Sequence, residues 1–179
     1  PYSASKAGAD QLVRSYGRTY GIKTLIANPC NNYGPNQFPE KFIPKMIFNI
    51  LNNKALPVYG KGKNVREWIY VKDNCEGLLK IFLRGKIGKS YNIGTGIRLR
   101  NIDIIKKLID ISKKNKIGVT SKNKIIFVMD RPGHDERYAL NSNRIKREIK
   151  WKHKTSISKG LSKTIDWYSK NLSFFKKIS

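Results

Sequence analysis

The sequence predicts an α/β protein built around a parallel sheet, and two neighbouring segments carry that prediction. Residues 4–20 show the apolar periodicity of a helix, and Gly21 follows as a stop signal. Residues 24–27 then form a short apolar run, partly β-branched, of the kind found in buried strands. A helix followed closely by a buried strand is half of a β-α-β repeat, in which the strands run parallel.

The elements expected after residue 35 are short and separated by loops. Residues 31–44 are rich in Asn, Gly and Pro and predict a loop that runs into a helix. Asp73 and Glu76 have the spacing of a capping box that opens a further helix. The periodicity predicts other helices at 42–51, 102–113 and 157–172, and strands at 56–60, 67–71, 90–94 and 125–128.

Composition excludes several classes of function. The chain has 179 residues and a net charge of +25, but its basic residues are scattered rather than gathered on one helix, so we expect no specific nucleic-acid partner. There is no apolar run of membrane-spanning length, and we expect no membrane association. The two cysteines, Cys30 and Cys75, lack metal-site spacing, which predicts no metal and a cytoplasmic location.

Tyr2 and Lys6 are the first candidate catalytic residues. Positions four apart lie on one face of a helix, about 6 Å apart along the axis. A phenol and an ammonium so placed can share one reacting hydroxyl, and the fixed positive charge favours the phenolate, which is the form that acts as a base. Small residues surround the pair and would allow close approach of a cofactor. The alternative is an ordinary helix start.

Asn31 and Asn32 lie just beyond the carboxyl end of the predicted strand. Ligands of open α/β sheets bind beyond the carboxyl ends of the strands, where loops converge. Two adjacent amides offer both donors and acceptors for a sugar hydroxyl or a carboxamide. An Asx turn ahead of Pro35 is the alternative.

Longer stretches carry a resemblance to a known family. The run N-N-Y-G-P-N-Q-F-P-E-K-F-I-P at 31–44 and the run D-R-P-G-H-D at 130–135 are similar to those of dTDP-glucose 4,6-dehydratases, which are extended short-chain dehydrogenase/reductases. Further matching segments lie at 57–62, 66–73, 91–94 and 167–168, so the resemblance covers nearly the whole chain. The Y-x-x-x-K and Y-G-P motifs are shared with epimerases and decarboxylases of nucleotide sugars.

The resemblance implies a fold and a domain division. We expect the C-terminal part of a Rossmann-like parallel sheet together with a small α/β substrate-binding lobe. Residues 1–35 would end the NAD-binding domain, and residues 36–179 would form mainly the nucleotide-sugar lobe. Segments such as 68–94 would return to the Rossmann sheet.

The resemblance also assigns roles near the cofactor. Tyr2 would take the proton from the 4-hydroxyl of the sugar while hydride passes to NAD. Lys6 would hold the ribose hydroxyls of the nicotinamide and favour ionised Tyr2, and Asn32 would lie beside the nicotinamide. NAD is therefore the implied cofactor.

The remaining roles implied by the resemblance concern the substrate, dTDP-glucose. Two arginines would clamp the diphosphate, which suits a planar fork of donors. Three of these residues have simpler alternatives: Asn101 could cap the next helix, His134 could be a solvated loop residue, and Arg66 could pair with Glu67 or Asp73. The residues predicted to bind substrate are Asn31, Lys41, Pro57, Tyr59, Arg66, Asn101, Arg131 and His134.

We therefore expect the C-terminal portion of a dTDP-glucose 4,6-dehydratase, which converts dTDP-glucose to the 4-keto-6-deoxy sugar and water. The parent enzyme would be a homodimer. The chain shows neither the glycine-rich dinucleotide turn nor the Thr-Asp-Glu set that the family uses for elimination, so we expect it to be inactive alone and poorly stable. The alternatives are a fragment of another nucleotide-sugar epimerase or decarboxylase, or a truncated product without catalysis.

Overall fold

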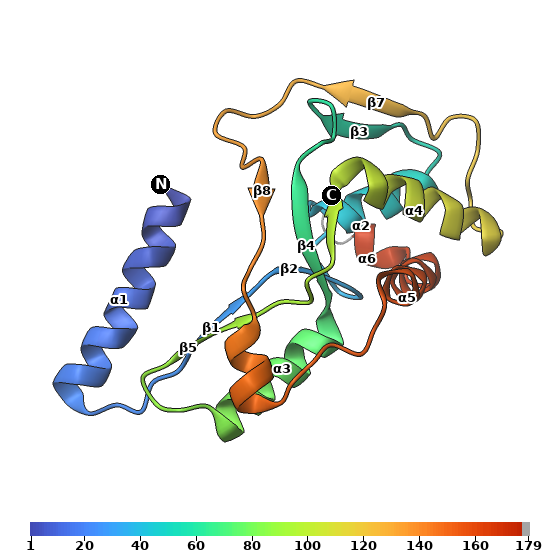
Figure 1. Cartoon of the computed structure of the whole chain (residues 1–179). Coiled ribbons are helices and arrows are strands. Elements are labelled where there is room, and N and C mark those ends of the chain that lie inside the picture. The colour runs from blue at the N-terminus through green and yellow to red at the C-terminus, as the bar shows by residue number, and fades with distance from the viewer. Residues whose placement is uncertain (177–179) are drawn as a thin grey trace.

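The computed structural model, which describes residues 1–176, confirms the α/β class (Figure 1). None of the helices in this part of the chain is long and apolar enough to cross a membrane. The helices are α1 (Tyr2–Tyr20), α2 (Phe42–Leu51), α3 (Val71–Arg84), α4 (Asn101–Lys114), the π-helix η1 (Ile145–Ile149), α5 (Ile157–Lys170) and α6 (Ser173–Lys176). The strands are β1 (Ile26–Pro29), β2 (Asn31–Tyr33), β3 (Leu56–Tyr59), β4 (Val65–Tyr70), β5 (Ser90–Ile93), β6 (Arg98–Arg100), β7 (Ile125–Val128) and β8 (Arg137–Tyr138).

Most strand pairs are parallel. β1 pairs with β5 and β3 pairs with β7, both in parallel register. β4 has three partners: its C-terminal half runs parallel to β2, while its N-terminal half pairs with β6 in antiparallel and with β8 in parallel register. β4 is therefore the strand that joins β2, β6 and β8 into one sheet, whereas the pairs β1–β5 and β3–β7 stand apart from it.

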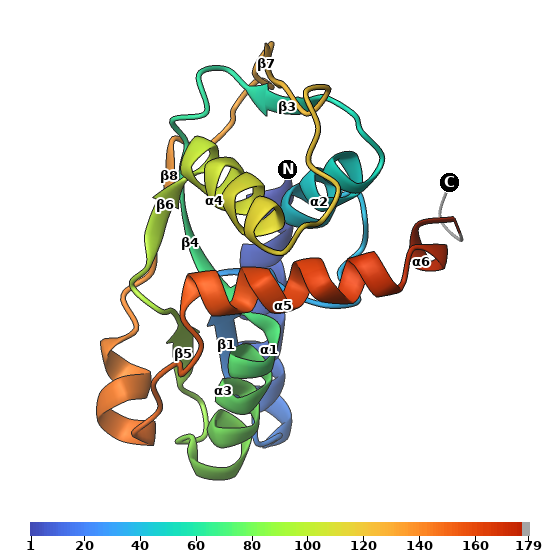
Figure 2. The same ribbon diagram turned by 90° about the vertical axis from the view of Figure 1, so that its right-hand side faces the viewer.

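Side chains of β4 enter two hydrophobic cores. Successive side chains of a strand point to opposite faces. Trp68 and Tyr70 accordingly belong to one core, which α2, α4 and α5 cover, and Ile69 belongs to a second core with residues of α3, η1 and β5. Figure 2 shows α5 crossing beside α2 and α4 at the first core. Both faces of β4 are thus buried.

The helix α1 differs from α2, α3, α4, η1 and α5 because none of its residues is buried. It stands to one side of the molecule, away from α2, α4 and α5 (Figure 1). Its link to the rest includes a hydrogen bond from Arg14 to the hydroxyl of Ser90, of 2.6 Å. The apolar side chains of its periodic pattern, such as Leu12 and Tyr16, are exposed.

Two predicted boundaries near the first strand are wrong. The strand β1 extends through Pro29 instead of ending before Asn28, because β5 pairs with it residue by residue as far as Ile93. Asn31–Tyr33 is the strand β2 and not a loop. Asn has a low intrinsic preference for strands, and pairing with β4 overrides it.

The predicted capping box at Asp73 and Glu76 is also wrong. The helix α3 begins at Val71, and no side chain caps its first turn. The buried carboxylate of Asp73 instead accepts hydrogen bonds from the backbone N–H groups of Lys154 and Thr155, at 3.3 and 2.8 Å. Glu76 forms ion pairs with Lys80 and Lys154. The acidic pair therefore fastens the segment before α5 instead of starting a helix.

Gly160 allows α5 to approach β2. A Cβ atom at this position would overlap the hydroxyl of Tyr33, a side chain that is itself fully buried. We predict that Gly160→Ala lowers the free energy of unfolding by about 3 kcal/mol, because a packed core accommodates an added methyl group only by strain. Denaturant unfolding measures the effect. Gly8→Ala is the matched control: nothing lies within 4 Å of its Cβ, so stability should rise by about 0.5–1 kcal/mol. Equal responses of the two variants would contradict the prediction.

Candidate functional site

A cavity of about 430 Å³ contains every residue that the sequence predicts to bind substrate. The elements around it converge from distant parts of the chain: β2, the start of α2, β3, β4, the start of α4 and the segment after β7. The predicted residues on its wall are Asn31, Lys41, Pro57, Tyr59, Arg66, Asn101, Arg131 and His134. The fold thus brings this predicted set together.

Arg66 provides a buried positive charge in the cavity wall. It is 8% exposed, and its guanidinium donates hydrogen bonds to the backbone carbonyls of Val65 and Asp135, at 2.8 and 2.7 Å. Burial lowers the pKa of Arg66, and the nearby charge of Arg131 acts in the same direction. Arg66 forms no ion pair with Glu67 or Asp73 among the described residues, so the pairing alternative is wrong.

His134 lies in the cavity wall and is largely shielded from solvent, since its side chain is only 7% exposed. Its ring meets the ring of Tyr59 edge-on, with centroids 6.1 Å apart. Nδ1 of His134 lies 2.7 Å from Oδ1 of Asp130. A solvated loop histidine, the alternative considered from the sequence, does not describe this environment.

Asn101 is the first residue of α4, and its side chain does not cap that helix. The residue in the N-cap position is Arg100, which has an extended backbone and makes no capping hydrogen bond through its side chain. The Arg100 guanidinium instead pairs with Asp103 at 2.7 Å. Asn101 lines the cavity, and because its side-chain amide does not cap the helix, that amide can contact a ligand there.

Several wall residues were missed by the sequence analysis. Phe42 stacks on Trp68, with centroids 6.0 Å apart and planes at 27°, and together they form an aromatic side of the cavity. Lys45 lies one helical turn after Lys41, and that spacing in a predicted helix was a usable signal. Glu40 lies inside the motif at 31–44, which was its signal, whereas nothing local in the sequence marked Met46 and Val128.

Glu67 anchors the backbone around the cavity from inside the fold. Its side chain is fully buried, and its two carboxylate oxygens accept hydrogen bonds from the N–H groups of Gly96 and Leu140, at 2.8 and 2.9 Å. Arg98 lies 3.9 Å away. These contacts join β4 to the segments that precede β6 and follow β8.

Tyr2, Lys6 and Asn32, the predicted catalytic and cofactor-binding residues, are not part of this cavity wall. The ammonium of Lys6 lies 5.8 Å from the centre of the Tyr2 ring, so the two side chains share a helix face as predicted. Tyr2 is 74% exposed. The amide of Asn32 donates to the carbonyl of Cys30 at 3.1 Å, while its Oδ1 is buried and has no hydrogen-bond partner in the described part of the chain.

Cys30 adjoins the asparagine pair but is not a reactive thiol. Burial raises its pKa to about 12, and the charge of Glu67 adds to the shift. A thiol held in its neutral form is a poor nucleophile. Cys30 therefore acts as a packing residue in the second core.

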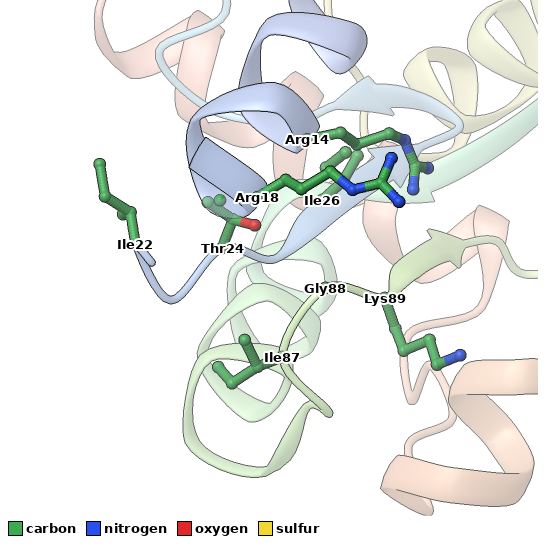
Figure 3. Close-up of a pocket in the computed structure, with 9 residues that line it drawn as sticks. Arg14, Arg18, Ile22, Thr24, Ile26, Ile87, Gly88 and Lys89 are labelled. Carbon is green, nitrogen blue, oxygen red and sulfur yellow. The ribbon is translucent and has the colours of Figure 1, made fainter. Parts of the chain in front are cut away.

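A second hollow, of about 310 Å³, contains none of the predicted site residues (Figure 3). It lies between the C-terminal part of α1 and the turn before β5. Arg14, Arg18 and Lys89 are its cationic wall residues, and the rest of its wall includes Ile22, Thr24 and Ile87.

The comparison with known proteins identifies the family of the chain. A profile of the GDP-mannose 4,6-dehydratase family matches residues 1–164. The chain belongs to this family. The dTDP-glucose 4,6-dehydratase of Shigella flexneri is 44% identical over 182 residues, and that of Xanthomonas campestris pv. campestris is 40% identical over 181 residues. Both alignments cover 99% of this chain and 50% or 52% of the relative. The resemblance inferred from the sequence motifs is confirmed.

Solved structures of the dehydratase family agree with the fold. The dTDP-glucose 4,6-dehydratase of Streptomyces venezuelae, solved with NAD bound, superposes with a TM-score of 0.92 at 40% identity. It covers all of this chain, which corresponds to 54% of that protein. The UDP-glucuronic acid 4-epimerase of Bacillus cereus, also solved with NAD, gives 0.87 at 25% identity over 95% of this chain and 52% of the epimerase. The fold is therefore that of the Rossmann-like dehydratases and epimerases.

The chain spans about half the length of the curated relatives it matches. The match to the GDP-mannose 4,6-dehydratase family includes both α1 and the residues of the cavity, since it runs from residue 1 to residue 164. The domain division at residue 35 stays a prediction.

Glu67 offers a test of how the cavity is held. We predict that Glu67→Gln lowers the free energy of unfolding by about 2 kcal/mol, because one carboxylate oxygen is replaced by an amide donor that faces a backbone N–H. Urea unfolding measures the loss. Glu40→Gln, at an exposed site, should change stability little. A Glu67→Gln variant as stable as the Glu40→Gln variant would show that the buried contacts contribute nothing.

Proposed function

We propose that this chain is the nucleotide-sugar half of a dTDP-glucose 4,6-dehydratase, the enzyme that converts dTDP-glucose to dTDP-4-keto-6-deoxyglucose and water. The observation that carries the proposal is the convergence of all the predicted substrate residues on one cavity with two arginines in its wall. The curated relatives with this activity, at 40–44% identity, support the choice of substrate.

The charge in the cavity suits a diphosphate. Arg66, Arg131 and Lys45 contribute positive charge, and the acidic wall residue Glu40 is already paired with Lys41 at 2.7 Å. A guanidinium presents several parallel N–H donors, which match phosphate oxygens in geometry and charge. Phe42 and Trp68 add an apolar side to the same space. The combination fits an anionic group joined to a less polar one, as in a nucleotide sugar.

We propose that Asn32 and the Tyr2–Lys6 pair hold the nicotinamide end of NAD. The buried Oδ1 of Asn32 has no hydrogen-bond partner among the described residues, and the N–H of a nicotinamide carboxamide can donate to it. When bound, NAD supplies the hydride acceptor of the reaction. Tyr2 takes the proton from the 4-hydroxyl of the sugar, and Lys6, which lies over the Tyr2 ring, stabilises the phenolate and holds the ribose hydroxyls.

We further propose that the complete protein is a cytoplasmic homodimer without a nucleic-acid or membrane partner. The helix α1 supports the dimer because its apolar side chains are exposed: Leu12 is 62%, Tyr16 is 52% and Tyr20 is 67% accessible. Exposed apolar side chains gathered on one surface, here called the dimer stripe, commonly form the contact between two protein chains.

The second candidate is an epimerase acting on another nucleotide sugar. The observation that favours it is the TM-score of 0.87 with the UDP-glucuronic acid 4-epimerase at 25% identity.

The complete gene product incubated with NAD and dTDP-glucose should yield the 4-keto-6-deoxy sugar. Turnover of UDP-sugars alone would exclude dTDP-glucose as the substrate. A gene product that converts neither class would favour the remaining alternative, a protein without catalysis.

Tyr2→Phe tests the proposed base. We predict that turnover of dTDP-glucose by the complete gene product falls by a factor of about 10²–10⁴, because the variant has no oxygen to accept the proton. Formation of the keto sugar measures the rate. Tyr20→Phe, at the other end of the same helix, is the matched control: it loses only a hydroxyl, keeps the apolar ring of the proposed dimer stripe and should retain activity. A Tyr2→Phe enzyme with full turnover would rule out this role.

Arg66→Lys tests the diphosphate clamp. We predict a KM for dTDP-glucose about tenfold higher with little change in kcat, because an ammonium cannot bond the Val65 and Asp135 carbonyls and still present a planar fork to phosphate. Steady-state kinetics measures both constants. Arg147→Lys, at a residue whose side chain is 76% exposed, is the control. An unchanged KM would argue against contact between Arg66 and the substrate.

A further inference from the structure

The second hollow, between the C-terminal part of α1 and the turn before β5, contains a pair of arginines. Arg14 and Arg18 lie one helical turn apart on α1, so their side chains share one face of the helix. In Figure 3 the two guanidinium groups extend in the same direction. None of the described residues that line the hollow is acidic. The wall of this hollow therefore carries positive charge without a carboxylate.

Neither of these two arginines is neutralised by the protein. Neither forms an ion pair among the described residues. Arg14 donates a hydrogen bond to the hydroxyl of Ser90, which is a neutral group, and the guanidinium of Arg144 donates to the carbonyl of the same serine at 2.7 Å. Like charges one turn apart on a helix repel each other. The cluster thus lacks a counter-charge, and a bound anion would supply it.

The same wall offers a neutral hydrogen-bond donor. Thr24 lines the hollow, and its hydroxyl makes no hydrogen bond among the described residues. Gly17 allows the chain after α1 to fold back against the helix: a Cβ at this position would lie 2.9 Å from Oγ1 of Thr24 and 3.3 Å from the carbonyl oxygen of Ile22. The close approach at Gly17 therefore keeps the Thr24 hydroxyl at the wall of the hollow.

The remaining wall of the hollow is largely aliphatic. Ile22, Ile26 and Ile87 belong to it, and Ile22 and Ile87 are each about half exposed. The volume of about 310 Å³ lies at the lower end of the range of roughly 300–1,000 Å³ for small-molecule sites. A bare anion would meet the donors and leave the isoleucines without contact. A small ligand with one anionic and one apolar part makes contact with both kinds of wall.

We propose that this hollow binds a phosphate monoester. Its phosphate accepts hydrogen bonds from Arg14, Arg18 and the hydroxyl of Thr24, and its small uncharged part lies against Ile22 and Ile87. A phosphate monoester carries a charge of about −1.5 to −2 at neutral pH, and the planar fork of a guanidinium matches its oxygens in pairs. The site does not depend on the proposed function, because none of the predicted site residues lines it.

A ligand in this hollow would fasten α1 to the rest of the molecule. α1 has no buried residue, and its hydrogen bond from Arg14 to Ser90 is exposed. A phosphate bonded by both arginines and by Thr24 bridges the helix and the segment that leads into β1. Binding should therefore raise the Tm of the folded protein.

Phenyl phosphate is the probe that tests the proposal. Calorimetric titrations of the complete gene product, at neutral pH and constant ionic strength, compare the unmodified protein with four variants: Arg18→Gln, Thr24→Val, Lys163→Gln and Arg131→Gln. Lys163 is exposed on α5, so its variant loses the same charge outside the hollow. Arg131→Gln removes a positive charge from the substrate cavity instead. Thr24→Val removes the hydroxyl and keeps the shape of the side chain.

We expect Arg18→Gln to raise the Kd for phenyl phosphate about tenfold, because it removes a charged donor, and Thr24→Val to raise it about threefold. Lys163→Gln and Arg131→Gln should each change the Kd less than about twofold, because neither residue touches the ligand. Inorganic phosphate should bind more weakly than phenyl phosphate. Phenyl phosphate should raise the Tm of the unmodified protein more than that of Arg18→Gln.

Three results would overturn the proposal. Equal weakening by Arg18→Gln and Lys163→Gln would show that net charge alone attracts the anion. A loss of binding in Arg131→Gln that Arg18→Gln does not reproduce would place phenyl phosphate in the substrate cavity. The third result is an unmodified protein that does not bind the probe.

Circular dichroism checks that each variant folds, and Thr24→Val keeps the proposal testable if Arg18→Gln does not. Binding of dTDP-glucose should be the same in Arg18→Gln as in the unmodified protein. Failure of this site therefore leaves the proposed function untouched, and failure to bind dTDP-glucose leaves this site untouched.

Discussion

The buried carboxylate of Glu67 is the constraint on which the cavity depends. β4 is covered on both faces, and a charged side chain in such a strand is costly unless each oxygen is hydrogen bonded. The N–H groups of Gly96 and Leu140 meet that requirement. Because those two groups come from segments far apart in the sequence, the same contacts that make Glu67 tolerable also fix the chain around β6 and β8. The hydrogen bonds that compensate for the burial of Glu67 are thus the same ones that position these two segments.

The alternation of β4 explains why the cavity adjoins the larger core. Arg66, Trp68 and Tyr70 lie two residues apart, so they share one face of the strand. Tyr70 is deep in the core, Trp68 stacks on Phe42 at its edge, and Arg66 reaches the cavity. β4 therefore begins at the cavity and ends in the core. This direction keeps the charge of Arg66 at the cavity end, away from the apolar surroundings of Tyr70.

The sequence predicted the cavity better than it predicted the strands. The residues predicted to bind substrate lie in contiguous motifs, such as 130–135, whose types and spacing are visible in one chain. β2, with its two asparagines, and β8, with two residues, form only because β4 lies beside them, and no local pattern reports such pairing. Asp73 illustrates the same limit: its spacing to Glu76 suggested a helix cap, whereas its partners are about eighty residues later, at Lys154 and Thr155.

The cavity keeps positive charge because neutral backbone groups hold Arg66. Arg66 is anchored by two backbone carbonyls, and Arg131 has no ion pair among the described residues. A carboxylate partner at either position would neutralise the guanidinium before a ligand arrived, whereas a carbonyl fixes the side chain and leaves its charge in place. Most of the chain's net charge of +25 is spread over its length, and that charge attracts anions without selecting among them. Arg66, in contrast, is a donor that is anchored in the cavity wall and left unneutralised before any ligand binds.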